Sequence, residues 1–490
     1  MTQTLHWLVV FCLSYLAVVF VCDVALLAVS ALENGRRVRQ RRAESLDALF
    51  VSGEVLPVSV IVPVYNEEAV VVPVVRSLLG LDYPQHEVIL VNDGSTDGTL
   101  ALLEREFALE RRAMFSQQAF SRGDDPVTYR SRTDPRLVVV DSPVNGGSKA
   151  HALNLALDFC RYPYVCGVDG DTIYDRRALI KAMAPVHRDP ARVVGVTSRI
   201  GVSTHPENHA DGADGSGPAA DMSFLGAFQH LEYLRSFLND RLAWSRLGFM
   251  LCTSGAFMLY RRDVIDEVGG FSPAFSCEDI EITFRIHEHL LRTRRKYRIV
   301  ALPDKVATTE GPASAQALVR QRARWQRVTL EVIWHYRRMI GNPRYKAVGL
   351  IGAPFFLLSE ALAPVFELAG TVSVALAVAL GLFEWQTFLL FLGVVAFANA
   401  VLASAGIWLE DAASREYRLR DLARLALLGP IELLAYRPIL AWARLKGTVG
   451  FLRRERSWGK FERNPRGPAG GGGARPAAPA LGPAGPRLVG

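Results

Sequence analysis

Two aspartates separated by one residue follow a short apolar run in the first half of the chain. The run Tyr164–Val168 is typical of a buried strand, and Asp169 and Asp171 come directly after it. Two carboxylates at such a strand end repel each other, and a divalent cation that bridges them to phosphate relieves the repulsion. Hard oxygen ligands favour Mg²⁺ or Mn²⁺. The pattern therefore predicts a metal site, with a solvated turn as the alternative.

Two other apolar runs also end in small, polar, turn-forming residues. Val58–Val62 leads to Tyr65, and Val88–Val91 leads to Asp93. At a strand end the Tyr65 ring can stack on a base, and the Asp93 carboxylate can accept the imide N–H of uracil. The alternative is that Asp93 lies in an ordinary turn and that Asp97 only caps a helix. Two such strand ends in succession favour a nucleotide site.

Candidate groups also lie at two predicted helix starts. The glycines before Lys149 and the lysine itself suit an anionic diphosphate, although the segment taken alone fits an ordinary Asn/Gly turn better. Glu278 and Asp279 precede a helix predicted over Ile280–Leu291, where acidic residues most often act as caps. Beside the Asp-x-Asp pair we interpret Asp279 as a general base that deprotonates an attacking hydroxyl, a role compatible with capping.

A basic segment in helical sequence, Arg320–Arg327, contains the remaining candidates. Gln321 and Trp325 share one helix face because they are four residues apart, and Arg324 lies beside them. Arginine makes bidentate contacts to phosphate, and the face of tryptophan suits the flat side of a sugar. The alternative, a basic helix beside anionic lipid, accounts for Arg320 and Arg327.

An α/β domain is expected to position these groups. Between residues 51 and 330, short β-branched runs alternate with helical patterns such as Ala69–Leu79 and Ala150–Cys160. Buried strands joined by crossover helices imply a mostly parallel sheet, in which ligands bind beyond the carboxyl ends of the strands. Two polar stretches, Gln117–Pro135 and Ser203–Ala220, are interpreted as surface insertions.

Apolar stretches flank this domain on both sides. Leu5–Leu32 is long enough to span a bilayer core of about 30 Å. An arginine-rich stretch follows it, so the positive-inside rule predicts an uncleaved anchor with the α/β domain in the cytoplasm. Ala347–Phe383 contains prolines and glutamates and predicts a broken pair, or one span after a surface helix. Thr387–Leu409 is a cleaner span, and Leu422–Leu452 either spans or lies at the interface.

The sequence thus predicts five parts. They are a transmembrane anchor (1–33), a basic juxtamembrane linker (34–54), a cytosolic domain (55–330), interfacial and transmembrane helices (331–452), and a basic, then Gly/Pro/Ala-rich disordered tail (453–490).

The composition excludes several classes of protein. With 50% of the 490 residues hydrophobic and 21% charged, a disordered or fibrous chain is excluded. The six cysteines form no metal or disulfide pattern. The net charge of +7 gathers beside the apolar stretches, so no nucleic-acid partner is expected.

Taken in order, these motifs resemble those of the membrane-integrated family 2 glycosyltransferases, which include cellulose, hyaluronan, chitin and poly-β-1,6-N-acetylglucosamine synthases. Gln321-Arg-Ala-Arg-Trp325 matches the Q-x-x-R-W pattern of that family in full, and Glu278-Asp279 matches its acidic pair. The chain has no Phe-x-Val-Thr-x-Lys gating loop after Trp325 and no c-di-GMP-binding domain. It is therefore more similar to the poly-N-acetylglucosamine and hyaluronan synthases, although those often have two N-terminal spans.

The resemblance implies a GT-A-type nucleotide-sugar domain and a role for each candidate residue. Asp279 and Glu278 form the implied catalytic pair. The implied donor-binding residues are Tyr65, Glu67, Asp93, Lys149, Asp169 and Arg324. The implied acceptor-binding residues are Thr253, Ser254, Gly255, Gln321 and Trp325. Asp169 and Asp171 would hold Mg²⁺ or Mn²⁺.

The implied reaction is one inverting displacement from a UDP-sugar to a polysaccharide or glycolipid acceptor at a lipid membrane, with an accessory export subunit as a possible partner. A processive synthase would pass its product through its own membrane helices, and Glu360 and Glu367 would either line that path or make helix contacts. Transfer of a single sugar to a lipid is the second hypothesis, which the Q-x-x-R-W helix disfavours. A non-catalytic, nucleotide-sensing membrane protein is the third, and Asp279 argues against it because binding alone needs no base.

Overall fold

The computed structural model describes residues 2–43, 55–121, 125–203, 222–382, 385–414, 417 and 419–455. Parts of three expected segments lie outside these described residues. They are the part of the linker after Ala43, the part of the second insertion after Ser203, and the part of the tail after Glu455. The chain divides into two units, Met1–Trp458 and Gly459–Gly490. All that follows concerns the first unit.

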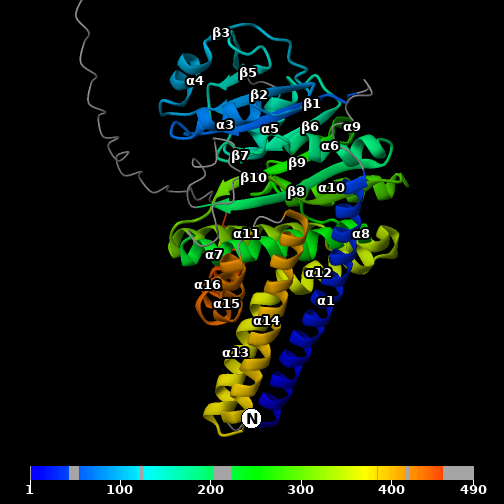
Figure 1. Cartoon of the computed structure of the whole chain (residues 1–490), viewed down its shortest axis with the longest axis vertical. Helices are drawn as coiled ribbons and strands as arrows, with labels where there is room; N and C mark the ends of the chain where they lie inside the picture. Colours follow the sequence, from blue (N-terminus) through cyan, green and yellow to red (C-terminus); the bar gives the residue numbers. More distant parts are fainter. Residues whose placement is uncertain are drawn as a thin grey trace, which may run out of the picture. The chain divides into compact units, whose positions relative to one another are not determined.

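Within the described residues, a ten-stranded sheet forms the centre of the α/β domain (Figure 1). Its strands, in spatial order, are β3 (Leu109–Arg111), β4 (Val127–Ser131), β5 (Leu137–Ser142), β2 (His86–Asp93), β1 (Val58–Val64), β6 (Tyr164–Val168), β9 (Phe257–Arg261), β8 (Val193–Ser203), β10 (Arg298–Glu310) and β7 (Ile173–Tyr174). The four strands β5, β2, β1 and β6 run parallel, and β9 is antiparallel to both of its neighbours. The predicted parallel core is confirmed, with antiparallel strands added on both sides.

Both faces of the central strands are buried, which explains why they read as continuous apolar runs. In β1, Val60 and Val62 pack into the core on one side of the sheet, and Ile61 packs into the core on the other. One side is covered by α3 (Val71–Leu79), α4 (Thr99–Phe107) and α6 (Ala178–Arg188). The other side is covered by α5 (Lys149–Leu157), α7 (Phe224–Leu234), α8 (Leu242–Leu247), α9 (Arg262–Glu267), α10 (Glu278–Arg292) and α11 (Ala315–His335).

The register of the sheet brings the strand ends to one edge. Val64 at the end of β1 pairs with Asn92 of β2, and Asp93 at the end of β2 pairs with Ser142 of β5. Tyr65 therefore follows β1 at the edge where Asp93 ends β2. The prediction that the candidate groups gather at the carboxyl ends of parallel strands is confirmed for these elements.

The first expected insertion is partly wrong. Within Gln117–Pro135, residues Val127–Ser131 form β4, which pairs antiparallel with β5 and with β3. Their polar side chains hid the strand, because only Thr128 and Ser131 of these five residues are buried. The segment therefore extends the sheet instead of lying on its surface.

In the part of the chain that the structure describes, two helices are long and apolar enough to cross a membrane, α1 (Thr2–Ala43) and α14 (Trp385–Ser414). Two bent helix pairs bring the candidate spans among the described residues to four if each pair is one span. The pair ending in α13 (Ala363–Ala379) bends by 48° at Leu362, which fits both a broken pair and one span after a surface helix. The other pair, α15 (Leu419–Ala435) and α16 (Arg437–Leu452), bends by 50°. In Figure 1, α7 and α11 lie between the sheet and the apolar helices α13 and α14, whereas α1 continues past them to the level of α10.

Buried ion pairs join the α/β domain to these helices. Arg199 of β8 contacts Glu410 of α14 at 2.5 Å, and their side chains are 4% and 3% exposed. Arg235, in the π-helical turn after α7, contacts Glu432 of α15 at 2.8 Å. Because such pairs must form to offset the cost of burying charge, they fix the domain against the helices.

Candidate active site

The Asp-x-Asp motif lies at the end of β6, as predicted. Gly170 lets the loop pass close to β1, since a Cβ there would lie 2.7 Å from the Pro63 carbonyl oxygen. The Tyr174 hydroxyl accepts a hydrogen bond from the Asp169 backbone N–H at 2.9 Å and lies 2.9 Å from the Ala256 carbonyl, to which it donates. Sequence reasoning missed Tyr174, which ties the motif to the turn before β9.

Lys149 joins the Asp-x-Asp motif to the acidic pair. Its ammonium group lies 2.6 Å from Asp169 Oδ1 and 2.8 Å from Glu278 Oε1, and it donates to the Gly255 carbonyl at 2.9 Å. The lysine opens α5 behind the Ser148 cap, which accepts from the His151 N–H. Residues predicted separately for the donor and for catalysis thus share one hydrogen-bonded cluster.

Asp279 lies in the first turn of α10 beside this cluster. Its two carboxylate oxygens accept from the backbone N–H groups of Gly255 at 2.9 Å and Ile280 at 2.8 Å. Burial, and to a smaller extent the neighbouring Glu278 charge, raises the pKa of Asp279 to about 6. The Lys149 charge acts in the opposite direction and lowers this pKa. A carboxylate held in this way is a stronger proton acceptor than an ordinary aspartate.

The turn Thr253-Ser-Gly255 packs directly on Asp279. A Cβ at Gly255 would lie 3.2 Å from Asp279 Oδ2 and 3.2 Å from Lys149 Nζ, so a larger residue would push both groups back slightly. Thr253 is fully buried, and its hydroxyl contacts Tyr260 at 2.9 Å and Thr283 at 3.3 Å. This burial contradicts a direct contact between the Thr253 side chain and an acceptor, and it gives that residue a supporting role beneath the turn.

Asp93 and Tyr65 lie at the neighbouring strand ends. Asp93 is buried, accepts from the Gly146 N–H at 3.0 Å and lies 3.4 Å from His151 Nδ1. Tyr65 is partly exposed, and the residues after it are held by the start of α4, since the Glu67 N–H donates to Thr99 Oγ1 at 3.0 Å. The structure therefore brings the Asp93 and Lys149 segments together through the Asn145-Gly-Gly turn.

The Q-x-x-R-W motif lies on α11, where Gln321, Arg324 and Trp325 are partly exposed. Burial raises the pKa of the Cys277 thiol, and the charges of Asp279, Arg324, Glu278 and Lys149 all act on it. The Arg324 charge therefore acts on Cys277, the residue that precedes the acidic pair. Arg327 is buried and contacts Ser276 at 3.4 Å, so its interpretation as a lipid contact is wrong.

Asp169 and Asp171 suit a hard divalent cation. Both side chains are partly exposed and flank a single glycine. Among the described residues, no three His, Cys, Asp or Glu side chains form a metal-binding cluster. A cation here would complete its shell with diphosphate and water oxygens, the arrangement that Mg²⁺ usually adopts with one or two carboxylates. The residues present fit such an ion.

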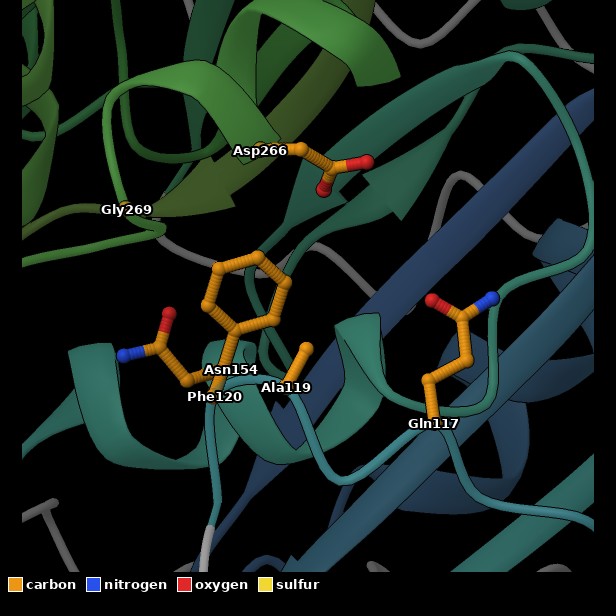
Figure 2. Close-up of a pocket in the computed structure, with 6 residues that line it drawn as sticks. All are labelled: Gln117, Ala119, Phe120, Asn154, Asp266 and Gly269. Carbon is orange, nitrogen blue, oxygen red and sulfur yellow. The ribbon is translucent and has the colours of Figure 1, made fainter.

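A separate cavity of about 470 Å³ opens beside α5 and α9 (Figure 2). Asn154, which lines it, bonds both the N–H and the carbonyl of Phe271 at 2.8 Å. None of the residues predicted for the active site lines this cavity, whose walls are formed by Gln117, Ala119, Phe120, Asn154, Asp266 and Gly269.

Comparisons with known proteins agree with this arrangement. Two family models match the chain, glycosyl transferase family 2 over residues 59–269 and glycosyl transferase family group 2 over residues 168–402. The poly-beta-1,6-N-acetyl-D-glucosamine synthase of Staphylococcus epidermidis is 25% identical over 276 residues, which are 56% of this chain and 55% of the relative. The synthase of Staphylococcus aureus strain COL is 25% identical over 55% of this chain and 53% of the relative. The chain thus spans about half the length of these curated relatives.

Solved structures show more distant likeness. The mannosyltransferase PcManGT from Pyrobaculum calidifontis, in complex with GDP-Man and Mn²⁺, has 19% identity and a TM-score of 0.47, over 89% of this chain and 99% of that chain. TarS 1–349 from S. aureus, in complex with UDP, has 17% identity and a TM-score of 0.38, over 84% of this chain and 94% of that chain.

The sheet order, the strand-end site and the matched models define a GT-A-like α/β protein with long apolar helices. The chain belongs to the family 2 glycosyltransferases, and it is a distant homologue of the poly-β-1,6-N-acetylglucosamine synthases.

Proposed function

We propose that this protein transfers N-acetylglucosamine from UDP-N-acetylglucosamine to the growing end of a β-linked polysaccharide, with inversion at the anomeric carbon. The sugar is chosen because the curated relatives are named as synthases of poly-β-1,6-N-acetylglucosamine. The observation that carries the proposal is the cluster in which Lys149 contacts both Asp169 and Glu278 next to Asp279. It combines a diphosphate-binding cation with a candidate base.

Asp279 is the proposed general base. With a pKa of about 6 it is mostly ionised at neutral pH and still accepts a proton readily. The Gly255 and Ile280 N–H groups hold its carboxylate in one orientation. Asp279 takes the proton of an acceptor hydroxyl while that oxygen bonds to the anomeric carbon and the bond from this carbon to the UDP oxygen breaks.

The donor is proposed to lie along the strand-end edge. Tyr65, Glu67 and Asp93 would bind its nucleoside part, and Lys149 and Arg324 would neutralise charge on the departing diphosphate. Mg²⁺ or Mn²⁺ held by Asp169 and Asp171 supplies further neutralisation of that charge when it is bound.

The acceptor is proposed to approach from the membrane side. Trp325 offers a flat face for a sugar ring, and Gln321, Ser254 and Gly255 lie on the two elements that flank the acidic pair. The same proposal puts the α/β domain in the cytoplasm of a multi-pass membrane protein, because the arginine-rich stretch that follows Leu32 fits the positive-inside rule. Export of the product through the apolar helices, with or without an accessory subunit, belongs to the same proposal.

Purified protein in lipid bilayers, given a panel of UDP-sugars with Mg²⁺ or Mn²⁺, tests the proposal through UDP release and product length. Release of UDP from UDP-N-acetylglucosamine together with long products is the expected result. Products with only one added sugar would replace it with transfer to a lipid acceptor. Failure to consume any UDP-sugar would replace it with a nucleotide-sensing role.

A further inference from the structure

A second arginine lies inside the Q-x-x-R-W motif, at a position that the pattern leaves open. Arg322 is buried, with only 4% of its side chain exposed. Its Nε and Nη2 donate to the two carboxylate oxygens of Glu232 on α7, at 3.0 and 2.8 Å. This two-point contact fixes the plane of the guanidinium group.

The same guanidinium group contacts both proposed acceptor residues of the motif. Its carbon lies 4.1 Å from the centre of the Trp325 ring, within the range of a cation–π contact. Its Nη1 donates to the Gln321 side-chain oxygen. The orientation of Arg322 therefore sets where the indole and the glutamine amide can lie.

Glu232 is in turn held from a third helix. The Tyr436 hydroxyl, just before α16, donates to Glu232 Oε2 at 2.5 Å. Burial alone would raise the pKa of Glu232, but Arg322 outweighs that effect, so the pKa is lowered and the carboxylate stays charged. Glu232 thus receives donors from α11 and from the start of α16.

We propose that Glu232 is a positioning residue for acceptor binding, acting through Arg322 to hold Trp325 and Gln321 in place. The inference rests on the proposed function, because it assumes that the Q-x-x-R-W residues bind a carbohydrate acceptor. Glu232 itself touches neither donor nor acceptor in this scheme. Its loss should therefore affect transfer to carbohydrate much more than reaction of the donor with water.

The chain offers a matched control. Glu432 is a fully buried glutamate, whereas the Glu232 side chain is 24% exposed, and Glu432 receives Arg235 in a two-point ion pair that joins the π-helical turn to α15. That pair contains no residue of the Q-x-x-R-W motif. Glu232→Gln and Glu432→Gln each remove one glutamate charge from a two-point arginine pair, but only the first frees the arginine that packs on Trp325.

The experiment uses the full chain in lipid bilayers, with UDP-N-acetylglucosamine and a β-1,6-linked N-acetylglucosamine oligosaccharide as probes. Extension of the oligosaccharide and hydrolysis of the donor are measured separately. For Glu232→Gln we expect extension to fall about 10- to 100-fold, the loss typical of a binding group displaced by roughly 1 Å. Hydrolysis should change less than about threefold in both variants.

A second variant, Arg322→Lys, keeps the charge but loses the planar fork, and it should reproduce the selective loss even if Glu232→Gln does not fold. Equal effects of Glu232→Gln and Glu432→Gln on both readouts would overturn the inference, as would normal extension by Arg322→Lys. A wild-type protein that hydrolyses the donor but never extends the oligosaccharide would refute the proposed function, and the inference with it.

Discussion

Replacement of Asp279 by Asn tests the proposed base most directly. The substitution keeps the shape of the side chain but removes the proton acceptor that the Gly255 and Ile280 N–H groups orient. A positioned general base contributes about 10²- to 10⁴-fold to rate, which corresponds to about 3–5 kcal/mol of barrier. We therefore expect kcat for sugar transfer to fall by that factor, while the KM for the UDP-sugar changes little.

Stability should not explain the loss. Because burial raises the pKa of Asp279 in the folded state to about 6, from 3.8, ionising it at pH 7 costs folding free energy, and an uncharged Asn avoids that cost. Asn has one side-chain oxygen, so one of the Gly255 and Ile280 N–H groups loses its acceptor in the variant, and this cost offsets the gain. The thermal midpoint of the variant should therefore stay close to that of the wild type above pH 6.

The pH profile of the wild type provides a second measurement. The ionised fraction of a group with this pKa is about 90% at pH 7 and about 10% at pH 5, so kcat should fall close to tenfold over that interval. UDP release measured against pH gives the curve directly. A folded Asp279→Asn variant that retained more than about a tenth of wild-type transfer would refute the assignment of the base.

Three further predictions use other parts of the structure. Gly255→Ala introduces a Cβ within 3.2–3.3 Å of the Lys149 cluster and should lower kcat; Gly393→Ala, which meets nothing within 4 Å, is the control, and equal activity of the two variants would contradict the argument. Asp171→Asn should raise the Mg²⁺ or Mn²⁺ concentration needed for half-maximal transfer, and full activity in EDTA would exclude the metal. Glu410→Ala removes the carboxylate partner of the buried Arg199 and should destabilise the protein by about 3–5 kcal/mol, seen as a lower thermal midpoint; an unchanged midpoint would show that the pair adds nothing.

The sequence predicted the central strands well for a physical reason. Strands such as Val58–Val64 and Tyr164–Val168 are covered on both faces, so nearly every position must be apolar and the run is easy to see. Val127–Ser131 is different, because its burial is incomplete and its residues are mostly polar. A strand of that kind forms where a neighbouring strand offers hydrogen bonds, which no local pattern reveals.

The residues of the candidate site also differ in whether a local sequence pattern reveals them. Residues whose chemistry follows from type and spacing, such as Asp169 and Asp279, can be predicted as site residues from the sequence alone. Glu232 was not, because its partner Arg322 is 90 positions away and only the packing of α7 against α11 brings them together. Tyr174 carried a weak local signal, as a tyrosine shortly after the Asp-x-Asp motif, but its hydrogen bonds depend on the turn at Ala256.

The ion pair between Arg199 and Glu410 has a practical consequence for anyone who expresses this protein. Cutting the chain after the α/β domain, to obtain a fragment that is easy to crystallise, would leave Arg199 facing a hole where the Glu410 carboxylate had been. The same cut would strip Tyr436 from Glu232 and Glu432 from Arg235. Such a fragment would carry three severed polar contacts on one apolar surface, and it should aggregate. The minimal expression unit therefore includes the helices through Leu452, purified in detergent or lipid.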